Sequence, residues 1–306
     1  MLSVHKENPG EIQRRKSMVS KEIRDRVVPI VYNNLKELYK NKLGTVYIDE
    51  RMKKIALPLQ ETASMGGFGV LPKGSRIPMQ EGKIIRGFTY WEKVDDIDLS
   101  VIGITVDGMQ REFSWRTMAG LNSSAIVYSG DQTSGYKGGS EYYDIDVAQF
   151  RKLYPDVKYI VFANNVYSRI PFLRCICKGG YMIREEVNSG EVYEPKTVAS
   201  SFAINCDSTF AYLFGIDLDA NELLWLNIAR SGITQVAGTT SLAFLLDYFN
   251  LTSIINLYDV FEMLASNLTN DASIADVVIT DEEVVTKEGA VVIRSCDVEK
   301  IMAYMN

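Results

Sequence analysis

Carboxylates gather in two short segments of the chain at a spacing suited to holding a cation. Asp96 and Asp98 stand at the start of an apolar strand, and because side chains alternate along a strand, the two acids point to the same face. Asp131 lies in a glycine-rich loop, 129–140, and Glu141 follows that loop directly. Glycines let the backbone turn sharply. An oxygen-rich loop of this kind is what a hard cation such as calcium requires.

The same acids have a simpler interpretation, because strand ends and loops are commonly acidic where they meet water. On residue types alone this interpretation is the stronger one. Carboxylates that share one face repel each other unless a positive charge neutralises them. The metal hypothesis therefore requires Asp96, Asp98, Asp131 and Glu141 to converge in space.

Catalytic designs that use histidine find no support in this chain. Its single histidine, His5, lies in a polar lead-in with no sign of order. Ser-His-Asp and Cys-His arrangements and a histidine-ligated zinc site are therefore excluded. No pair of a nucleophile and a base is visible elsewhere. We expect a protein that is not an enzyme and has no catalytic residues.

Composition narrows the class of partner and the compartment. The 306 residues are 46% hydrophobic, which is normal for a chain with a packed core. A formal charge of −6 argues against a dedicated nucleic-acid-binding protein. No apolar run is long enough for a transmembrane segment, and the N-terminus lacks the apolar core of a secretory signal. We expect a cytoplasmic protein.

Hydrophobic residues recur with a period of two from about Leu71 onward, which indicates strands. Short strands with turn signals at regular intervals favour an antiparallel sandwich over βαβ units. The fold expected is mainly β, a two-sheet antiparallel β-sandwich with flanking N-terminal and C-terminal helices. The candidate strands are 84–91, 99–106, 112–115, 125–128, 142–147, 158–167, 172–184, 201–205, 209–218 and 222–229.

The flanking segments show helical spacing instead. The sequence divides into an N-terminal helical or mixed region with a connector (1–70), the sandwich (71–232), and C-terminal helices with a tail (233–306). Pro29 is expected to kink or divide the first helix. The helices are expected at 19–43, 242–249 and 257–268, followed by a strand at 291–294 and a short helix ending at Met305.

Several of these segments resemble the TerD-type domain of tellurium-resistance and stress-response proteins. The matching elements are RGFTYW followed by DIDLS, then VYSGDQTSGYKGGSEYYDIDV, KYIVFANNVYS and KGGYMIREEVNSGEVYEP. They occur in the family's order over about 71–232. PGEIQRR and PKGSRIPMQEGKIIRGFTYW are closest to large bacterial cytoplasmic proteins that carry a TerD-like domain in their C-terminal part. The resemblance leaves three alternatives: the chain is a shortened member of this group, the end of a longer protein, or a standalone two-part protein.

The resemblance implies a β-sandwich that binds calcium through clustered acids, without enzymatic activity. Its motifs assign metal ligands to Asp96, Asp98, Asp131 and Glu141 and imply partner proteins in a stress-response complex.

The chain departs from the family pattern in the glycine loop. Gln132 stands in place of the usual Asn, Ser140 in place of a carboxylate, and Lys137 in a stretch that is often acidic. Fewer anionic ligands weaken calcium binding. A metal-free protein-interaction scaffold that keeps the fold is therefore the alternative.

Overall fold

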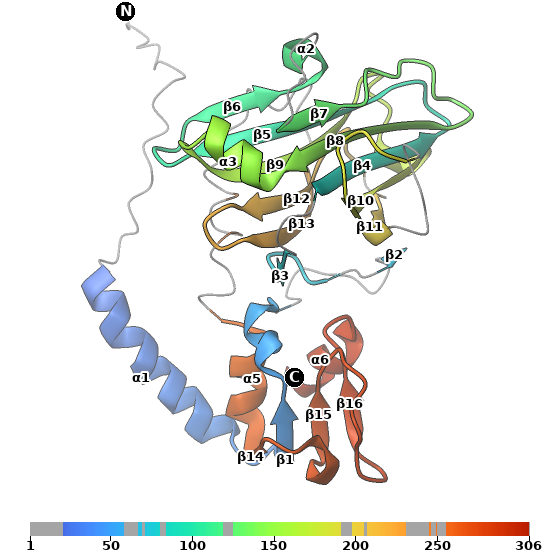
Figure 1. Ribbon diagram of the computed structural model, residues 1–306. Helices are drawn as coiled ribbons and strands as arrows, with labels where there is room; N and C mark the ends of the chain where they lie inside the picture. Colours follow the sequence, from blue (N-terminus) through green and yellow to red (C-terminus); the bar gives the residue numbers. More distant parts are fainter. Residues whose placement is uncertain are drawn as a thin grey trace, which may run out of the picture.

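The computed structural model describes most of the chain. The described residues are 21–57, 67–68, 71–79, 84–118, 125–190, 198–204, 207–230, 245, 249 and 255–305. Three sheets organise them, two antiparallel and one parallel (Figure 1).

The two antiparallel sheets each contain six strands and pack face to face. The first has the order β2-β11-β10-β4-β8-β7, and the second β3-β13-β12-β9-β5-β6. This confirms the prediction of a mainly β protein with antiparallel sheets, and each of the ten predicted strands overlaps an observed one. The strands are β2 (Gly67–Phe68), β3 (Arg76–Pro78), β4 (Ile84–Glu92), β5 (Ile97–Thr105), β6 (Gln110–Phe113), β7 (Ile126–Tyr128), β8 (Gly139–Asp146), β9 (Val157–Val166), β10 (Ile176–Arg184), β11 (Val198–Ala203), β12 (Phe210–Asp217) and β13 (Glu222–Arg230).

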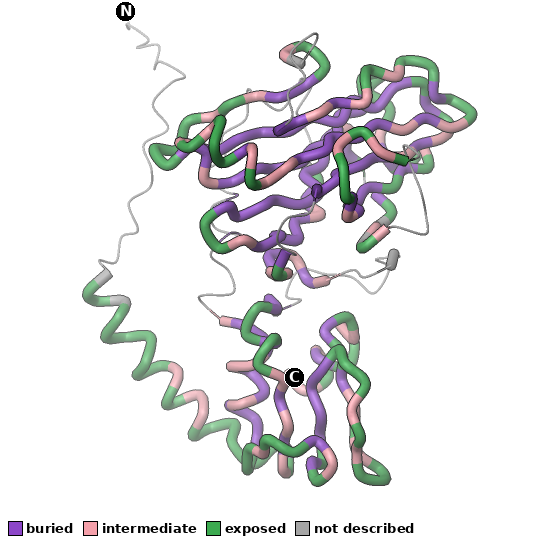
Figure 2. Tube along the Cα trace, in the orientation of Figure 1, coloured by how far each residue is buried: buried purple, intermediate pink, exposed green. Residues whose placement is uncertain are grey.

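Large aromatic side chains fill the space between these two sheets. Trp91 and Tyr143 of the first sheet and Phe162 and Phe214 of the second are all buried in one core. Phe162 and Phe214 stack with their ring centroids 4.4 Å apart. The purple strands of Figure 2 show how completely this region is buried. Burial of this much apolar surface supplies the main stabilisation of the fold.

The outer face of the second sheet is also covered, which explains why β5 and β12 are apolar on both faces. A separate buried cluster includes Ile102 of β5, Tyr212 of β12, and the helical residues Leu245 and Phe249. The predicted helix at 242–249 otherwise lies outside the described residues. Strands buried on both faces have nearly continuous apolar sequences instead of alternating ones.

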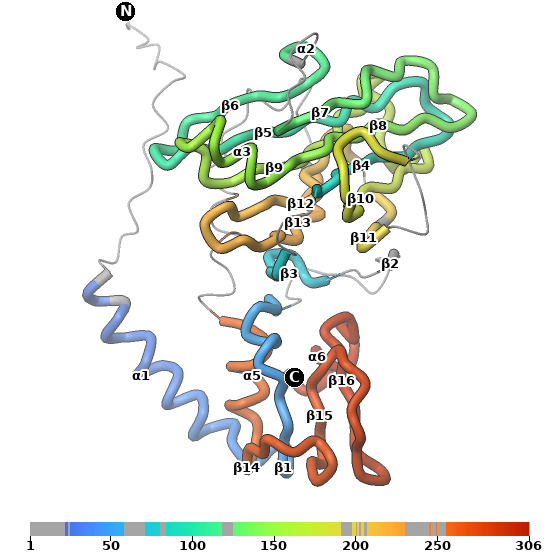
Figure 3. Tube along the Cα trace, viewed as in Figure 1, coloured from blue at the N-terminus to red at the C-terminus, as the bar shows by residue number. Residues whose placement is uncertain are grey.

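The first and last parts of the chain, which the sequence treats as separate regions, share a four-stranded parallel sheet. Its order is β14-β1-β15-β16, with β1 from the N-terminal part and the other three strands from the C-terminal part (Figure 3). The elements are α1 (Lys21–Tyr39), β1 (Leu43–Ile48), η1 (Glu50–Lys54), α5 (Leu257–Leu264), β14 (Ala265–Thr269), η6 (Ala272–Ile274), β15 (Val277–Ile279), β16 (Val291–Ile293) and α6 (Val298–Met305).

The helical predictions need correction at the end of one helix and at Pro29. The helix predicted at 257–268 ends at Leu264, because Ala265–Thr269 pairs with β1 as strand β14. Pro29 does not divide α1, which is continuous from Lys21 to Tyr39. Short helices also occur inside the sandwich region: α2 (Trp115–Met118), α3 (Val147–Leu153) and η2 (Phe172–Arg174).

Polar contacts connect the parallel sheet to the sandwich. The Lys54 ammonium pairs with Glu222 of β13 at 2.8 Å. The backbone N–H of Ala56 donates to the Ser75 hydroxyl at 3.0 Å in a buried position. Leu71 packs against the cores of both parts. No helix among the described residues is long and apolar enough to cross a membrane.

The parallel sheet gives a test of the link between the two ends of the chain. Ile279 is fully buried and lies opposite Ile48 and Ile293. Ile279→Ala should lower the unfolding free energy by about 2–5 kcal/mol, because it leaves a cavity in the core. Hydrogen exchange should accelerate in β1, more than 200 positions away.

The control is Val291→Ala, whose side chain is 39% exposed on β16. It should change the exchange rates of β1 little. If the amides of β1 exchanged at the wild-type rate in Ile279→Ala, the proposal that both ends of the chain share one core would be contradicted.

Candidate metal centre

The β4–β5 connection positions the first two acids. β4 ends at Glu92, and the chain turns at Lys93, whose φ is +68°. Asp96 directly precedes β5, and Asp98 is its second residue. Asp98 lies opposite Asn165 of β9, which donates from Nδ2 to Asp98 Oδ2 at 3.2 Å. Pairing with a central strand thus holds Asp98 in place.

The loop between β7 and β8 brings Asp131 to the same end of the sandwich. Its N-terminal turn uses Gly130 at φ +98°, where a β-carbon would be strained. Its C-terminal part lies on Trp91: a β-carbon on Gly135 would come within 2.4 Å of Trp91 Nε1. The Gly135 N–H also donates to the Asp95 carbonyl at 2.6 Å. Glycine at position 135 therefore permits the contact that joins this loop to the β4–β5 turn.

Glu141 supports the site from inside the sandwich. It is fully buried at the start of β8, and its two carboxylate oxygens accept backbone N–H groups from different segments. Leu99 of β5 donates to one oxygen at 2.8 Å, and Gln132 of the loop donates to the other at 3.0 Å. Burial raises the pKa of Glu141 to about 8, although these hydrogen bonds favour the charged form.

Three of the four predicted ligands converge. One carboxylate oxygen from each of Asp96, Asp98 and Asp131 lies within 4.8 Å of the other two. Asp96 is 9% and Asp98 4% exposed, whereas Asp131 is exposed. Glu141 is outside this group, with its oxygens directed to Leu99 and Gln132.

No cationic side chain among the described residues forms an ion pair with the acids of the trio. Burial, followed by repulsion from Asp98, Asp131 and Asp95, raises the pKa of Asp96 to about 7. Burial and the charge of Asp131 raise the pKa of Asp98 to about 6, against the opposing effect of the hydrogen bond from Asn165. No cationic side chain is among the causes for either acid.

A hard cation fits this arrangement. Asp96 Oδ1 is buried and has no hydrogen-bond partner among the described residues, which is costly unless something else satisfies it. All donors are carboxylate oxygens, the type that calcium and magnesium prefer. A cation held between them would lower the repulsion and satisfy the orphaned oxygen.

Two groups of buried or nearly buried charges in the described part of the chain form ion pairs, in contrast to the trio. Arg86 and Asp144 are both fully buried and form a two-pronged ion pair, with distances of 2.6 and 2.8 Å. Arg76 likewise bonds both Asp217 and Glu222, at 3.0 and 2.8 Å. Paired charges of this kind have a structural role.

Ser140, Gln132 and Lys137 of the glycine loop have definite positions in the structure. The Ser140 hydroxyl donates to the Thr89 carbonyl at 2.7 Å, and the Gln132 side chain accepts the Ser140 N–H at 2.9 Å. Lys137 is exposed. Sequence reasoning missed Asn165 as the partner of Asp98, and the only signal was an Asn pair inside an apolar strand, FANNV.

Comparisons with known proteins do not assign the chain to a family. A scan against protein-family models finds no match, and searches of the curated proteins and of the solved structures find none either.

The raised pKa values predict how stability depends on pH in the absence of a cation. A carboxyl whose pKa is higher in the folded than in the unfolded state stabilises the fold when protonated. The contribution of Asp96 should be complete below about pH 4 and lost as the pH rises toward about 7. Denaturant unfolding in EDTA across this range should show a smaller decline for Asp96→Asn than for wild type. If the unfolding free energies of wild type and Asp96→Asn declined equally with pH, the raised pKa of Asp96 would be contradicted.

Proposed function

We propose that this protein is a non-enzymatic calcium-binding module with a TerD-like β-sandwich. The observation that carries the proposal is the uncompensated trio of Asp96, Asp98 and Asp131, whose oxygens lie within 4.8 Å of one another. The orphaned Asp96 Oδ1 supports it independently. Calcium is bound between the β4–β5 turn and the glycine loop, and Glu141 holds these segments together.

Calcium suits this trio better than magnesium or a soft metal. Carboxylate oxygens are poor ligands for metals that prefer sulfur or imidazole. Magnesium demands a near-ideal octahedron, whereas calcium accepts the irregular geometry of two loops. Three carboxylates leave several coordination positions to water or backbone oxygens. The affinity is therefore modest, as for sites with few anionic ligands.

The cellular setting follows from the resemblance to TerD-type domains. It implies a cytoplasmic protein of a tellurium-resistance-type stress-response system that acts through partner proteins. A binding role agrees with the absence of histidine from the described residues, since His5 lies outside them. Bound calcium changes the charge and the rigidity of the end of the sandwich that carries the glycine loop. A partner protein can recognise this surface.

The second candidate is a metal-free interaction scaffold that keeps the fold. Ser140, which stands in place of a carboxylate, is the observation that favours it. In that case the trio is protonated or solvated, and its residues have no ligand role.

Calcium should raise the melting temperature of the protein, because a ligand that binds only the native state stabilises it by mass action. At about 100 times the dissociation constant, the gain is about 2.7 kcal/mol. Magnesium should produce a smaller rise. Asp98→Asn with Asp131→Asn should abolish the response and leave the metal-free protein equally stable or slightly more stable, because repulsion is relieved.

The matched control changes two acids that lie outside the trio, Asp219→Asn with Glu283→Gln, and should keep the calcium response. Isothermal titration calorimetry measures the stoichiometry, expected to be one. A melting temperature indifferent to calcium up to several millimolar would reject the metal site in favour of the scaffold.

A further inference from the structure

Helix α1 has an apolar face that the rest of the described protein does not cover. Its C-terminal half packs on α5, where the Tyr32 hydroxyl donates to Glu262 at 2.7 Å. Its N-terminal half extends away from the body and is exposed (Figures 1 and 2). The uncovered face consists of Ile23 (53% exposed), Val27 (46%), Ile30 (61%) and Val31 (50%).

These residues lie on one side of the helix. Ile23, Val27 and Ile30 follow each other at intervals of four and three, the spacing of one helical face. Yet this half of α1 is a poor helix by itself. It contains Pro29 and five β-branched residues, all of which disfavour helix. A helix of this composition requires a surface to pack against.

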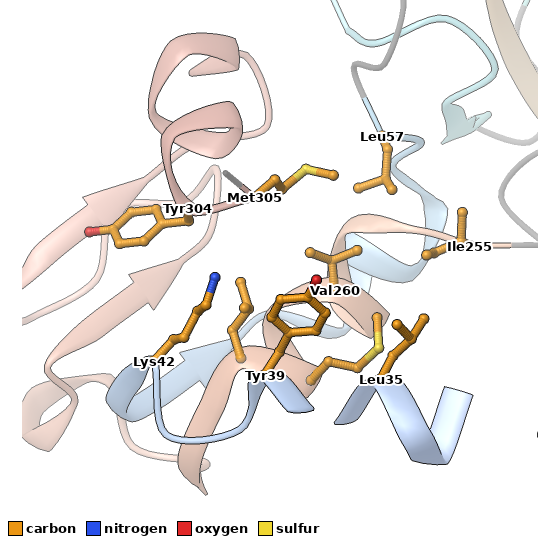
Figure 4. A pocket seen from close by; sticks show the side chains of 10 residues that line it. Leu35, Tyr39, Lys42, Leu57, Ile255, Val260, Tyr304 and Met305 are labelled. Carbon is orange, nitrogen blue, oxygen red and sulfur yellow. The ribbon is translucent and has the colours of Figure 1, made fainter. Parts of the chain in front are cut away.

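The apolar face continues into an open hollow beside the parallel sheet. Val28, Val31, Leu35 and Tyr39 form one ridge along α1, and the last two line the hollow. The hollow has a volume of about 190 Å³, with Met263 of α5 and Met305 of α6 among its other lining residues (Figure 4). The exposed apolar face of α1 and the lining of the hollow thus form one continuous apolar region.

Lys42 lies at the edge of this apolar region. Lys42 lines the hollow, and its ammonium lies 4.7 Å from the centre of the Tyr39 ring. The stem of a lysine can cover apolar surface while its ammonium reaches for water or an anion. An occupant of the apolar region therefore meets a positive charge at its border.

The distribution of charge along the chain identifies the kind of occupant. Residues 1–42 contain ten Lys and Arg against five Asp and Glu, whereas the rest contains 23 against 34. The segment that carries the apolar face is therefore cationic on an otherwise acidic protein. A second copy would bring two cationic segments together, and nucleic acid offers no apolar surface to a helix. An anionic lipid surface satisfies both the charge and the apolar face.

We propose that α1 docks on an anionic lipid bilayer and lies in the plane of its surface. Ile23, Val27, Ile30 and Val31 enter the boundary between headgroups and acyl chains. Arg26 and Lys42 meet the anionic headgroups. The acidic sandwich is directed away from the membrane. This inference is independent of the metal site.

The test measures co-sedimentation of the full-length chain with vesicles, in EDTA so that calcium cannot bridge protein and lipid. Vesicles of phosphatidylcholine with phosphatidylglycerol should bind the protein, and pure phosphatidylcholine should bind it much less. Raising the salt should weaken binding, since screening shortens the electrostatic range. Ile23→Glu with Val27→Glu should reduce binding at least about tenfold. Arg26→Gln with Lys42→Gln should reduce it about 30-fold.

Two controls separate docking from misfolding and from self-association. Val106→Glu with Val285→Glu adds the same charge at residues that are 72% and 80% exposed elsewhere, and should retain most of the binding. The Ile23 and Val27 variant should keep the wild-type melting temperature, because this half of α1 extends away from the body. Sedimentation velocity at rising concentration should show a monomer. A dimer abolished by Ile23→Glu with Val27→Glu, or failure to bind anionic vesicles, would overturn the proposal.

Discussion

A single buried carboxylate ties the two sheets of the sandwich to the loop at its acidic end. Glu141 belongs to the first sheet and accepts one hydrogen bond from Leu99 in the second sheet and one from Gln132 in the loop. Hydrogen bonds from backbone amides to a buried carboxylate are strong, and loss of the acceptor leaves two donors unsatisfied. The positions of Asp98 and Asp131 relative to each other depend on this bridge. A residue expected to be a ligand is thus a structural support of the site.

The two kinds of buried charge in the sandwich follow different rules. Arg86 and Asp144 neutralise each other, and the Arg86 guanidinium also stacks on the Tyr142 ring at 3.8 Å. Asp96 and Asp98 have no such cation, and burial raises the pKa of both. A protein that buries like charges together accepts a loss of stability at that point. Such a loss is typical of binding sites, where the ligand supplies the missing charge.

The sandwich could be predicted from the sequence because its signals are local. The strand pattern of residues 84–91 or 158–167 is visible within ten residues. The acids of the segments DIDLS and GDQ can likewise be recognised one by one. The exclusion of Glu141 from the trio could not be predicted, because it depends on which backbone amides face its carboxylate. The parallel sheet was missed for a similar reason. Ala265–Thr269 continues a helical pattern, and only its pairing with β1 makes it a strand.

The parallel sheet imposes an order on the folding of the protein during its synthesis. Leu43 pairs with Ala265, so about 220 residues must be added before β1 can meet its partner. At about 5–20 residues per second, this takes roughly 10 to 45 s. The strands of the sandwich find most of their partners within the intervening segment, and that part of the chain is free to fold on the ribosome first. During this interval the apolar residues of β1, Val46 among them, have no sheet to enter. The parallel sheet can therefore form only after the sandwich strands between β1 and β14 have been made.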